Sequence, residues 1–258
     1  MPLNGNDTLT VKALASSSKG NSYVVTGGGC ALLVDCGLTY CDFVRRLGAL
    51  SPNLMPGSFL GVLVTHSHID HVQGLEVFAK RCPEVPVFAN AMTAEVLVAK
   101  YHVREESIVC FENGQPFVVG DFEVQAFSVP HDTSDPVGYL VRGGSDTYFH
   151  ATDIGTPLDS IGVKLSEADV ATLESNHDAV MLRRSNRPPS LIQRIAGPSG
   201  HLSNDQAALL VERFARPRLR QLNLAHLSHD CNTPEIAESV MRNALNGIDR
   251  GDVELRIF

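Results

Sequence analysis

Four potential metal ligands lie within six residues of this sequence, in the segment Thr65–His71. The segment reads Thr-His-Ser-His-Ile-Asp-His, which places histidine at 66, 68 and 71 and aspartate at 70. Side chains two residues apart in an extended chain point the same way, so His66 and His68 can reach one ion. Imidazole and carboxylate groups bind zinc or a similar divalent ion and leave a position open for water. A single histidine is usually structural, but His66, His68, Asp70 and His71 in this order favour a metal site.

Two predicted elements would position this segment. The apolar run Phe59–Val64 precedes it and predicts a short buried strand. A helix is expected to start at His71 and to run through Phe78, with Asp70 as its cap. The four ligands are therefore expected on a turn between a strand and a helix.

Three later predicted strands also end beside a potential ligand, namely His131, Asp153 and His226. Two divalent ions about 3.5–4 Å apart need several such ligands, and a carboxylate often bridges them. A histidine at a strand end can also be purely structural. His229 is the alternative to His226, because it lies only three residues further on.

The remaining pattern alternates strands with helices and shows neither a repeat nor a low-complexity linker. This favours one α/β domain over residues 1–258, built as a sandwich of two sheets with helices outside. Strands are expected at 9–15, 22–26, 31–35, 59–64, 85–88, 116–119, 122–129, 137–142, 147–152, 169–173, 219–224 and 253–258, and helices at 40–47, 71–78, 93–101, 178–183, 189–195, 205–214 and 235–245.

Composition excludes several classes of protein. The apolar fraction of 43% suits a large core, and no apolar run approaches the roughly 20 residues that span a membrane. The first seven residues lack the pattern of a signal peptide, and the six cysteines form no Cys-x-x-Cys pair. We therefore expect a cytoplasmic protein with reduced thiols and no membrane partner. The net charge of −8 argues against a protein that coats nucleic acid non-specifically.

The charge is nevertheless uneven. Residues 183–220 contain eight arginines against Asp205 and Glu212, a net charge of +6 that leaves −14 for the remainder. One interpretation is a solvated helical face, and the other is a rim near the active site that attracts anions. The arginines are Arg183, Arg184, Arg187, Arg194, Arg213, Arg216, Arg218 and Arg220.

The motif His-x-His-x-Asp-His, followed in order by His131, Asp153 and His226, resembles the metallo-β-lactamase superfamily of metal-dependent hydrolases. Further motifs resemble its YycJ/WalJ-type branch, while His229-Asp230-Cys231 departs from the polar residues expected there. The matching motifs are Leu14–Asn21, Glu174–Asp178, Gly200–Asn204, and His226–Ser228 followed by Asn232–Pro234.

The resemblance implies an αββα fold of two mixed sheets and a centre of two divalent ions, zinc or manganese, with iron as a further option. It implies that His66, His68 and His131 bind one ion. Asp70, His71 and His226 would bind the other, and Asp153 would bridge the two. The implied activity is that of a phosphodiesterase or nuclease, with a 5′-exonuclease on DNA as the specific form.

In such a site, a hydroxide held between two ions would attack the phosphorus. Asp70 is predicted to be a catalytic residue as well as a metal ligand. The leaving group needs a proton, for which His201 is the first candidate and His177 the second, although both can also be local packing or capping residues. No Gly-x-Ser-x-Gly motif suggests a serine nucleophile. Hydrolysis of a small cyclic phosphodiester, thioester or lactone is the alternative activity, and a non-catalytic regulatory domain is the alternative class. A homo-oligomer is left open.

Overall fold

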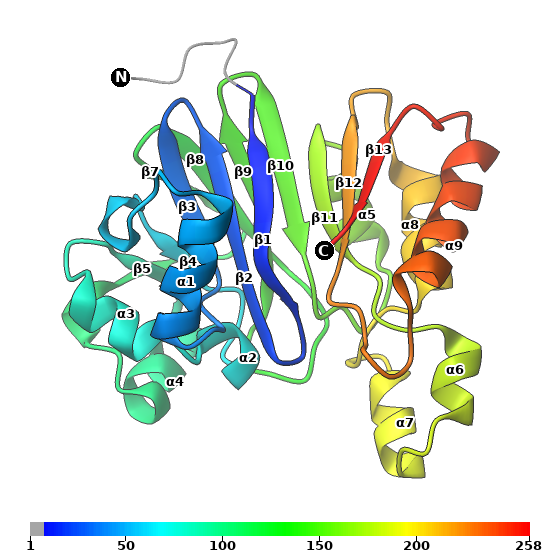
Figure 1. Ribbon diagram of the computed structural model, residues 1–258, viewed down its shortest axis with the longest axis horizontal. Coiled ribbons are helices and arrows are strands. Elements are labelled where there is room, and N and C mark those ends of the chain that lie inside the picture. The colour runs from blue at the N-terminus through cyan, green and yellow to red at the C-terminus, as the bar shows by residue number, and fades with distance from the viewer. Residues whose placement is uncertain (1–7) are drawn as a thin grey trace. The chain divides into compact units, whose positions relative to one another are not determined.

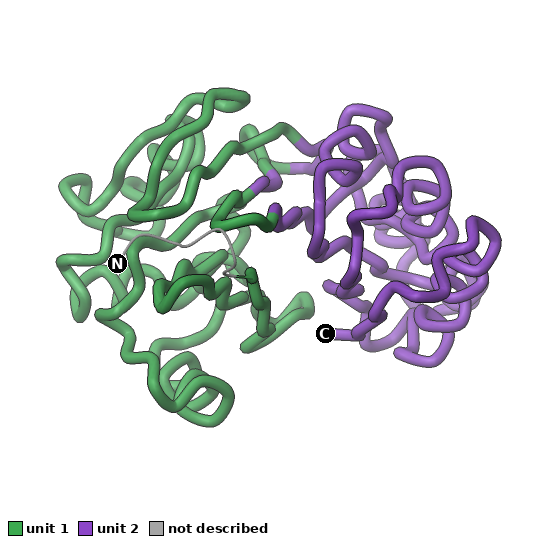
Figure 2. The backbone as a smooth tube through the Cα atoms, turned by 90° about the horizontal axis from the view of Figure 1, so that it is seen from above, with its two compact units in different colours: residues 1–128, 133–137, 141–146 green, residues 129–132, 138–140, 147–258 purple. Residues whose placement is uncertain are grey.

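The computed structural model describes residues 8–258, and their contacts separate into two compact units (Figure 2). Unit 1 contains the described residues up to Ser128 together with 133–137 and 141–146. Unit 2 contains residues 129–132, 138–140 and 147–258. That the whole chain acts as a single domain stays a prediction.

Unit 1 is built on a six-stranded mixed sheet with the order β1-β2-β3-β4-β5-β6 (Figure 1). The pairs β1–β2 and β2–β3 are antiparallel, whereas β3, β4, β5 and β6 are parallel neighbours. The strands are β1 (Thr10–Ser17), β2 (Gly20–Gly27), β3 (Cys30–Val34), β4 (Val62–Leu63), β5 (Val87–Asn90) and β6 (Ile108–Phe111), and the hairpin β7 (Pro116–Val119) and β8 (Phe122–Ser128) follows.

Helices of unit 1 cover this sheet through buried aromatic and aliphatic side chains. In α1 (Tyr40–Leu50), Phe43 and Leu47 are buried four residues apart, on one helical face. The Phe43 ring meets Phe78 edge to face, with ring centroids 5.5 Å apart. The other helices are α2 (Ile69–Val72), α3 (Leu75–Arg81), α4 (Ala91–Tyr101) and the short 3-10 helices Pro56–Ser58 and Glu105–Ser107.

The helix predicted from His71 to Phe78 is wrong in one respect, because two helices, α2 and α3, occupy this stretch. Gly74 separates them, and a Cβ atom added there would lie 2.0 Å from the Leu38 carbonyl oxygen. Its amide donates instead to the Cys36 carbonyl at 2.9 Å. The prediction of Asp70 as the cap is also wrong, since His68 is the N-cap residue and Asp70 lies inside the first turn of α2.

Unit 2 contains four parallel strands, β10 to β13, with helices beside them (Figure 1). The helix α8 begins with a reciprocal cap in which the Ser203 hydroxyl accepts from the Gln206 amide and the Gln206 side chain accepts from the Ser203 amide. The elements from residue 137 onward are β9 (Val137–Gly143), whose residues are divided between the two units, β10 (Asp146–Ala151), α5 (Asp159–Leu165), β11 (Val170–Glu174), α6 (Ala179–Arg184), α7 (Pro189–Ile195), α8 (Asn204–Phe214), β12 (Gln221–Ala225), α9 (Pro234–Gly247) and β13 (Glu254–Ile257).

The second sheet has seven strands in the order β13-β12-β11-β10-β9-β8-β7. Two mixed sheets flanked by helices confirm the predicted fold class. Sequence reasoning did not predict β6 or α5, and β4 is shorter than the expected strand at residues 59–64. These differences leave every candidate ligand at the end of a strand or in the first turn that follows it.

Candidate metal-binding residues

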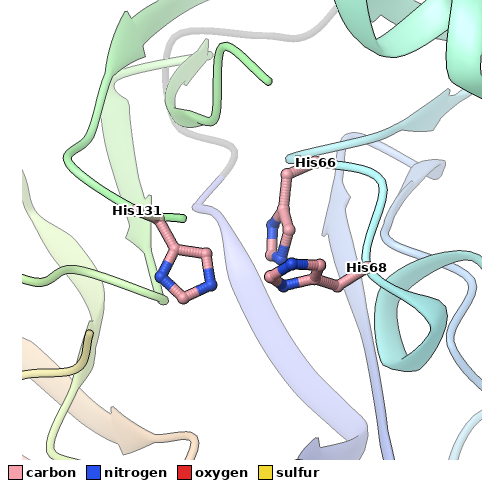
Figure 3. Close-up of side chains that lie close together, drawn as sticks. All are labelled: His66, His68 and His131. Carbon is pink, nitrogen blue, oxygen red and sulfur yellow. The ribbon is translucent and has the colours of Figure 1, made fainter. Parts of the chain in front are cut away.

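In unit 1, three histidine rings of the motif lie together after β4. The centroids of the His66 and His68 rings are 4.9 Å apart, and those of His66 and His71 are 4.0 Å apart. Figure 3 shows the His66 and His68 rings next to each other. His66 and His71 are buried, whereas His68 is partly exposed. The structure therefore brings the imidazoles of His66, His68 and His71 into one cluster.

A buried carboxylate, Asp35, orients two of these rings. Its side chain accepts from the Thr65 amide at 2.8 Å, from the Thr65 hydroxyl at 2.8 Å and from His71 Nδ1 at 2.7 Å. The Thr65 hydroxyl oxygen is in turn 3.0 Å from His66 Nδ1. Both histidines are thus held through Nδ1, which leaves Nε2 as the nitrogen that can bind an ion.

Asp35 is fully buried, and that burial raises its pKa above the usual value. The neighbouring His71 and Thr65 oppose the rise through charge and hydrogen bonds. Sequence reasoning placed Asp35 at a strand end without assigning it a role. The signal that could have found it was a carboxylate placed directly after the apolar strand at residues 31–34.

Asp70 lies beside His71, with Oδ2 3.6 Å from His71 Nε2. The Asn21 side-chain nitrogen is 3.3 Å from Asp70 Oδ2 and 3.0 Å from His71 Nε2. Gly37 packs against the same turn, where any larger residue would meet the Asp70 carbonyl oxygen. The polar loop that ends at Asn21 therefore contacts the candidate ligands directly, which explains why it accompanies the histidine motif.

In unit 2, four further side chains converge at the carboxyl ends of parallel strands. Each offers a potential ligand atom, and these atoms all lie within 4.8 Å of one another. Asp153 follows β10, Glu174 ends β11, His226 follows β12, and His201 precedes α8. Carboxyl ends of neighbouring parallel strands meet at one edge of a sheet, which is the usual position of sites in α/β folds.

Glu174 orients both histidines of this group. Its Oε1 accepts from His201 Nδ1 at 2.8 Å and from His226 Nδ1 at 3.0 Å. Its Oε2 accepts from the amides of Ile154 at 2.8 Å and Leu202 at 3.0 Å. Since two donors occupy each oxygen, Glu174 acts as a positioning residue, and the two histidines present Nε2.

The charges within this group are strongly coupled. Burial would raise the pKa of Glu174, but the charge of His201 and hydrogen bonds from His201 and His226 outweigh it and lower the pKa to about 2. Burial likewise opposes a charged His201, yet the adjacent Glu174 raises the pKa of the imidazole. Glu174 lies in the motif at 174–178, for which the sequence prediction named His177 as a candidate proton donor and gave Glu174 no role.

His131 is anchored in the same way. Its Nδ1 is 3.0 Å from the Gly200 carbonyl oxygen, and its Nε2 is 3.7 Å from Asp153 Oδ1. The ring centroids of His131 and His201 are 5.1 Å apart. Figure 3 shows the His131 side chain as well. The structure therefore places His131, Asp153, His201 and His226 close together within unit 2.

Buried asparagines join the three segments that carry this group. Asn232 exchanges a pair of 2.9 Å hydrogen bonds with Asn204, and its nitrogen also donates to the Ser175 carbonyl at 2.9 Å. The Ser175 hydroxyl donates to Asn204, and the Asn176 side chain donates to the His226 carbonyl at 2.8 Å. The motifs at 174–178, 200–204 and 232–234 are thus one hydrogen-bonded support for the loops of His201 and His226.

The other histidines have different surroundings. His177 is 3% exposed, its pKa is lowered chiefly by burial, and it is not part of the group. His229 has an 87% exposed side chain beside Asp230 and does not join the group either. His102 is the C-cap of α4 in a left-handed conformation, and buried His150 Nδ1 is 2.9 Å from the Tyr148 hydroxyl.

The donor set fits divalent metal ions by its chemistry. His66, His71, His131 and His226 are each held through Nδ1 by a carboxylate, a hydroxyl or a carbonyl group. This is the usual support of metal-binding histidines, since it fixes the tautomer and the ring orientation. All nitrogen and oxygen donors of this kind suit zinc, manganese or iron.

Comparison with known proteins now decides the family. The β-lactamase superfamily domain matches residues 31–226, a range that includes the candidate ligands from His66 to His226. The chain belongs to the metallo-β-lactamase superfamily. The structure of the metallo-β-lactamase fold protein YhfI from Bacillus subtilis superposes with a TM-score of 0.71 at 18% identity, over 97% of this chain and 96% of that one.

Two curated relatives place the chain in the YycJ/WalJ branch of this superfamily. The exodeoxyribonuclease YycJ of Bacillus anthracis is 34% identical over 92% of this chain and 89% of its own length. The exodeoxyribonuclease WalJ of Streptococcus pneumoniae is 32% identical over 95% and 91%, respectively. The chain is therefore a metal-dependent hydrolase, as the resemblance predicted. Among residues 8–258, no helix combines the length and apolarity needed to cross a bilayer.

Proposed function

We propose that this metallo-β-lactamase superfamily member is a phosphodiesterase that removes nucleotides from the ends of DNA. The observation that carries the proposal is its likeness to YycJ over nearly the full length of both chains. The alignment with WalJ, which is also named an exodeoxyribonuclease, extends over 249 residues. A cytoplasmic location accords with six cysteines that are all free thiols in the described part of the chain.

The proposed ligands follow the assignment that the resemblance implied. His66, His68 and His131, the side chains drawn in Figure 3, would bind one ion. Asp70, His71 and His226 would bind a second, and Asp153 would be shared. The anchored Nδ1 atoms described above support this assignment, because they leave Nε2 as the ligand atom in four of the histidines.

Bound divalent ions would polarise a phosphoryl oxygen and lower the pKa of water to about 7. His201 is proposed as the proton donor to the leaving group. Its Nδ1 is engaged by Glu174, so Nε2 is the atom that can hold or give a proton, and its side chain is 21% exposed. His177 is the weaker candidate of the two, since its side chain is buried outside the group.

The test is a cleavage assay on single-stranded DNA oligonucleotides labelled at the 5′ or the 3′ end, with manganese or zinc added. We expect labelled mononucleotides from the 5′-labelled strand at early times and a ladder of shortened products from the 3′-labelled strand. His68→Ala should abolish both, while His229→Ala, an exposed histidine outside the group, serves as the matched control.

Two outcomes would contradict the proposal. Intact DNA with every metal, together with turnover of a cyclic phosphodiester, thioester or lactone, would establish a hydrolase of small substrates instead. If the protein carries no metal by elemental analysis and cleaves none of these substrates, the alternative of a non-catalytic regulatory domain would be favoured. The number and identity of the ions follow from the same elemental analysis.

A further inference from the structure

The helices α6 and α7 form a small hairpin within unit 2, visible together at one end of the ribbon (Figure 1). The hairpin has its own apolar cluster, in which Leu182, Ile195 and Cys231 are buried. It starts directly after the motif at 174–178 and ends just before the motif at 200–204. Both ends of the hairpin are thus continuous with segments that position the candidate active-site group.

The hairpin is strongly basic. Residues 179–196 contain four arginines and neither an acidic residue nor a lysine. Arg187 pairs with Asp230 at 3.1 Å, and Arg194 pairs with Asp132 at 2.6 Å. These two pairs attach the hairpin to the loops that follow His226 and His131.

Arg183 and Arg184 differ from their neighbours. Both are exposed at the C-terminal end of α6, and within residues 8–258 no acidic side chain forms an ion pair with either. The helix up to this point has six residues, so they lie only about 9 Å along its axis from Asp178. Exposed cations without an acidic partner, on a hairpin whose two ends continue into the motifs at 174–178 and 200–204, are groups that can bind a phosphate backbone.

The surface beside the hairpin is hollowed. A pocket of about 340 Å³ is lined by Asp132, by Ser190, Gln193 and Arg194 of α7, and by residues 197–199. Its volume falls in the range of small-ligand sites, roughly 300–1,000 Å³. Asp132 directly follows His131 in the chain, so this pocket is lined by the neighbour of a candidate ligand and by α7 of the basic hairpin.

The other arginines of the 183–220 segment are engaged elsewhere. Arg213 pairs with Asp159 at 2.8 Å, and Arg218 pairs with Asp169, which precedes β11 at the amino-terminal edge of the strands. Arg216 donates to backbone carbonyls next to the end of α8. Arg213, Arg216 and Arg218 are therefore bonded away from the hairpin, whereas Arg187 and Arg194 of the hairpin pair with the loops that follow His226 and His131.

We propose that the α6–α7 hairpin, through Arg183 and Arg184, binds the phosphate backbone of the DNA strand whose end is being cleaved. This inference rests on the proposed function for its substrate, but it concerns binding of the strand beyond the scissile phosphate. It explains how a chain with a net charge of −8 can bind DNA, since the basic surface is local.

The test compares two double variants that lose the same charge. Arg183→Gln/Arg184→Gln removes the proposed contacts, and Arg213→Gln/Arg216→Gln removes two exposed arginines of the same segment at the far end of α8. That end lies about 16 Å along the helix from its start near His201. Binding of a fluorescent 20-nucleotide phosphorothioate DNA strand, which resists cleavage, is measured by anisotropy with metal present and at several salt concentrations.

We expect the Arg183→Gln/Arg184→Gln variant to lose a salt-dependence slope of about 1.4, since each phosphate contact on a single strand contributes about 0.7. If the variant and the unmodified protein bind equally at 1 M salt, this slope difference makes the variant bind roughly 25-fold more weakly than the unmodified protein at 0.1 M salt. The Arg213→Gln/Arg216→Gln variant should bind like the unmodified protein. Hydrolysis of bis(p-nitrophenyl) phosphate, which is too small to reach the hairpin, should be unchanged in both.

Equal weakening by both pairs, or no change in the slope for Arg183→Gln/Arg184→Gln, would overturn the inference. So would competition by polyglutamate as effective as competition by DNA, since that would indicate a general polyanion surface. Failure of the proposed function looks different. In that case the unmodified protein binds the strand through Arg183 and Arg184 but cleaves no DNA, and the binding inference stands.

Discussion

Replacing Glu174 by glutamine removes one of the two carboxylate oxygens on which the unit 2 group depends. Oε1 accepts from His201 and His226, and Oε2 accepts from the amides of Ile154 and Leu202. A glutamine side chain has a single acceptor oxygen, so at least two of these donors lose their acceptor. Each buried donor left without an acceptor costs about 1–3 kcal/mol, which gives a loss of roughly 2–6 kcal/mol in the free energy of unfolding.

The measurement is urea unfolding of the metal-free protein, followed by circular dichroism. Glu167→Gln is the matched control, because Glu167 makes a partly exposed pair with Lys164 at 3.3 Å and its loss should cost under about 1 kcal/mol. Metal affinity should also fall by about 10–100-fold, since Glu174 orients the His226 ring. A Glu174→Gln protein as stable as the control would refute the reasoning.

The pH dependence of this difference has a definite sign. The pKa of Glu174 is about 2 in the folded protein against an ordinary value of 4.5. A lowered folded pKa means that the stabilisation is fully present above pH 4.5 and is lost as the pH falls toward 2. The stability gap between the unmodified metal-free protein and Glu174→Gln should therefore shrink as the pH falls below 4.5. At the other end, Glu174 raises the pKa of His201, so the contribution of that pair is fully present below pH 6.5 and is lost as the pH rises through the raised pKa.

Three further substitutions test neighbouring parts of the site. Asp35→Asn should lower zinc affinity about 10–100-fold in a chelator competition, because the carboxylate holds His71 through Nδ1, whereas Asp42→Asn on the exposed start of α1 should not. Asn232→Ala should lower the free energy of unfolding in urea by about 1–3 kcal/mol, since it leaves buried partners of the amide without a hydrogen bond; an unchanged free energy of unfolding would contradict the support assigned to Asn232. His229→Ala should leave DNA cleavage and metal content as they are, and a loss of bound metal would return His229 to the ligand set.

The candidate ligands could be predicted from the sequence because their signal is local. Each follows a short apolar run, and a histidine or aspartate just after a buried strand suggests a functional role. The predicted helix α7, at Pro189–Ile195, also agrees residue for residue with the structure, since proline and the flanking turn residues mark both ends. Local chemistry was sufficient in these cases.

The supporting carboxylates could not be predicted in the same way. Asp35 contacts His71 across 36 positions, and Glu174 contacts His226 across 52. Nothing next to either residue in the sequence names its partner, because the contact is made only when separate strands pair. The sequence showed only that each carboxylate lies at the end of a buried strand. Its role could be assigned only once the fold showed which histidine it contacts.

Backbone conformation shows how far this positioning constrains the chain. Asp35, Asp153 and His226 each adopt a left-handed conformation, with φ of 58°, 58° and 59°; Asp35 and His226 directly follow β3 and β12, and Asp153 lies two residues after β10. For residues other than glycine this conformation costs on the order of 1–3 kcal/mol each. His102 and Asp249 share it at positions outside the site, so a positive φ alone does not identify a ligand.

At Asp35 and His226, hydrogen bonds to the rest of the site offset the strain. Asp35 receives three hydrogen bonds from Thr65 and His71, and His226 is held by Glu174 through its ring and by Asn176 through its carbonyl. Each bond contributes about 0.5–1.5 kcal/mol, and more where a charge is involved, so two or three are enough to balance one left-handed residue. The strained turn and its supporting carboxylate are therefore a single arrangement: the turn aims the side chain, and the buried bonds keep it aimed before any ion arrives.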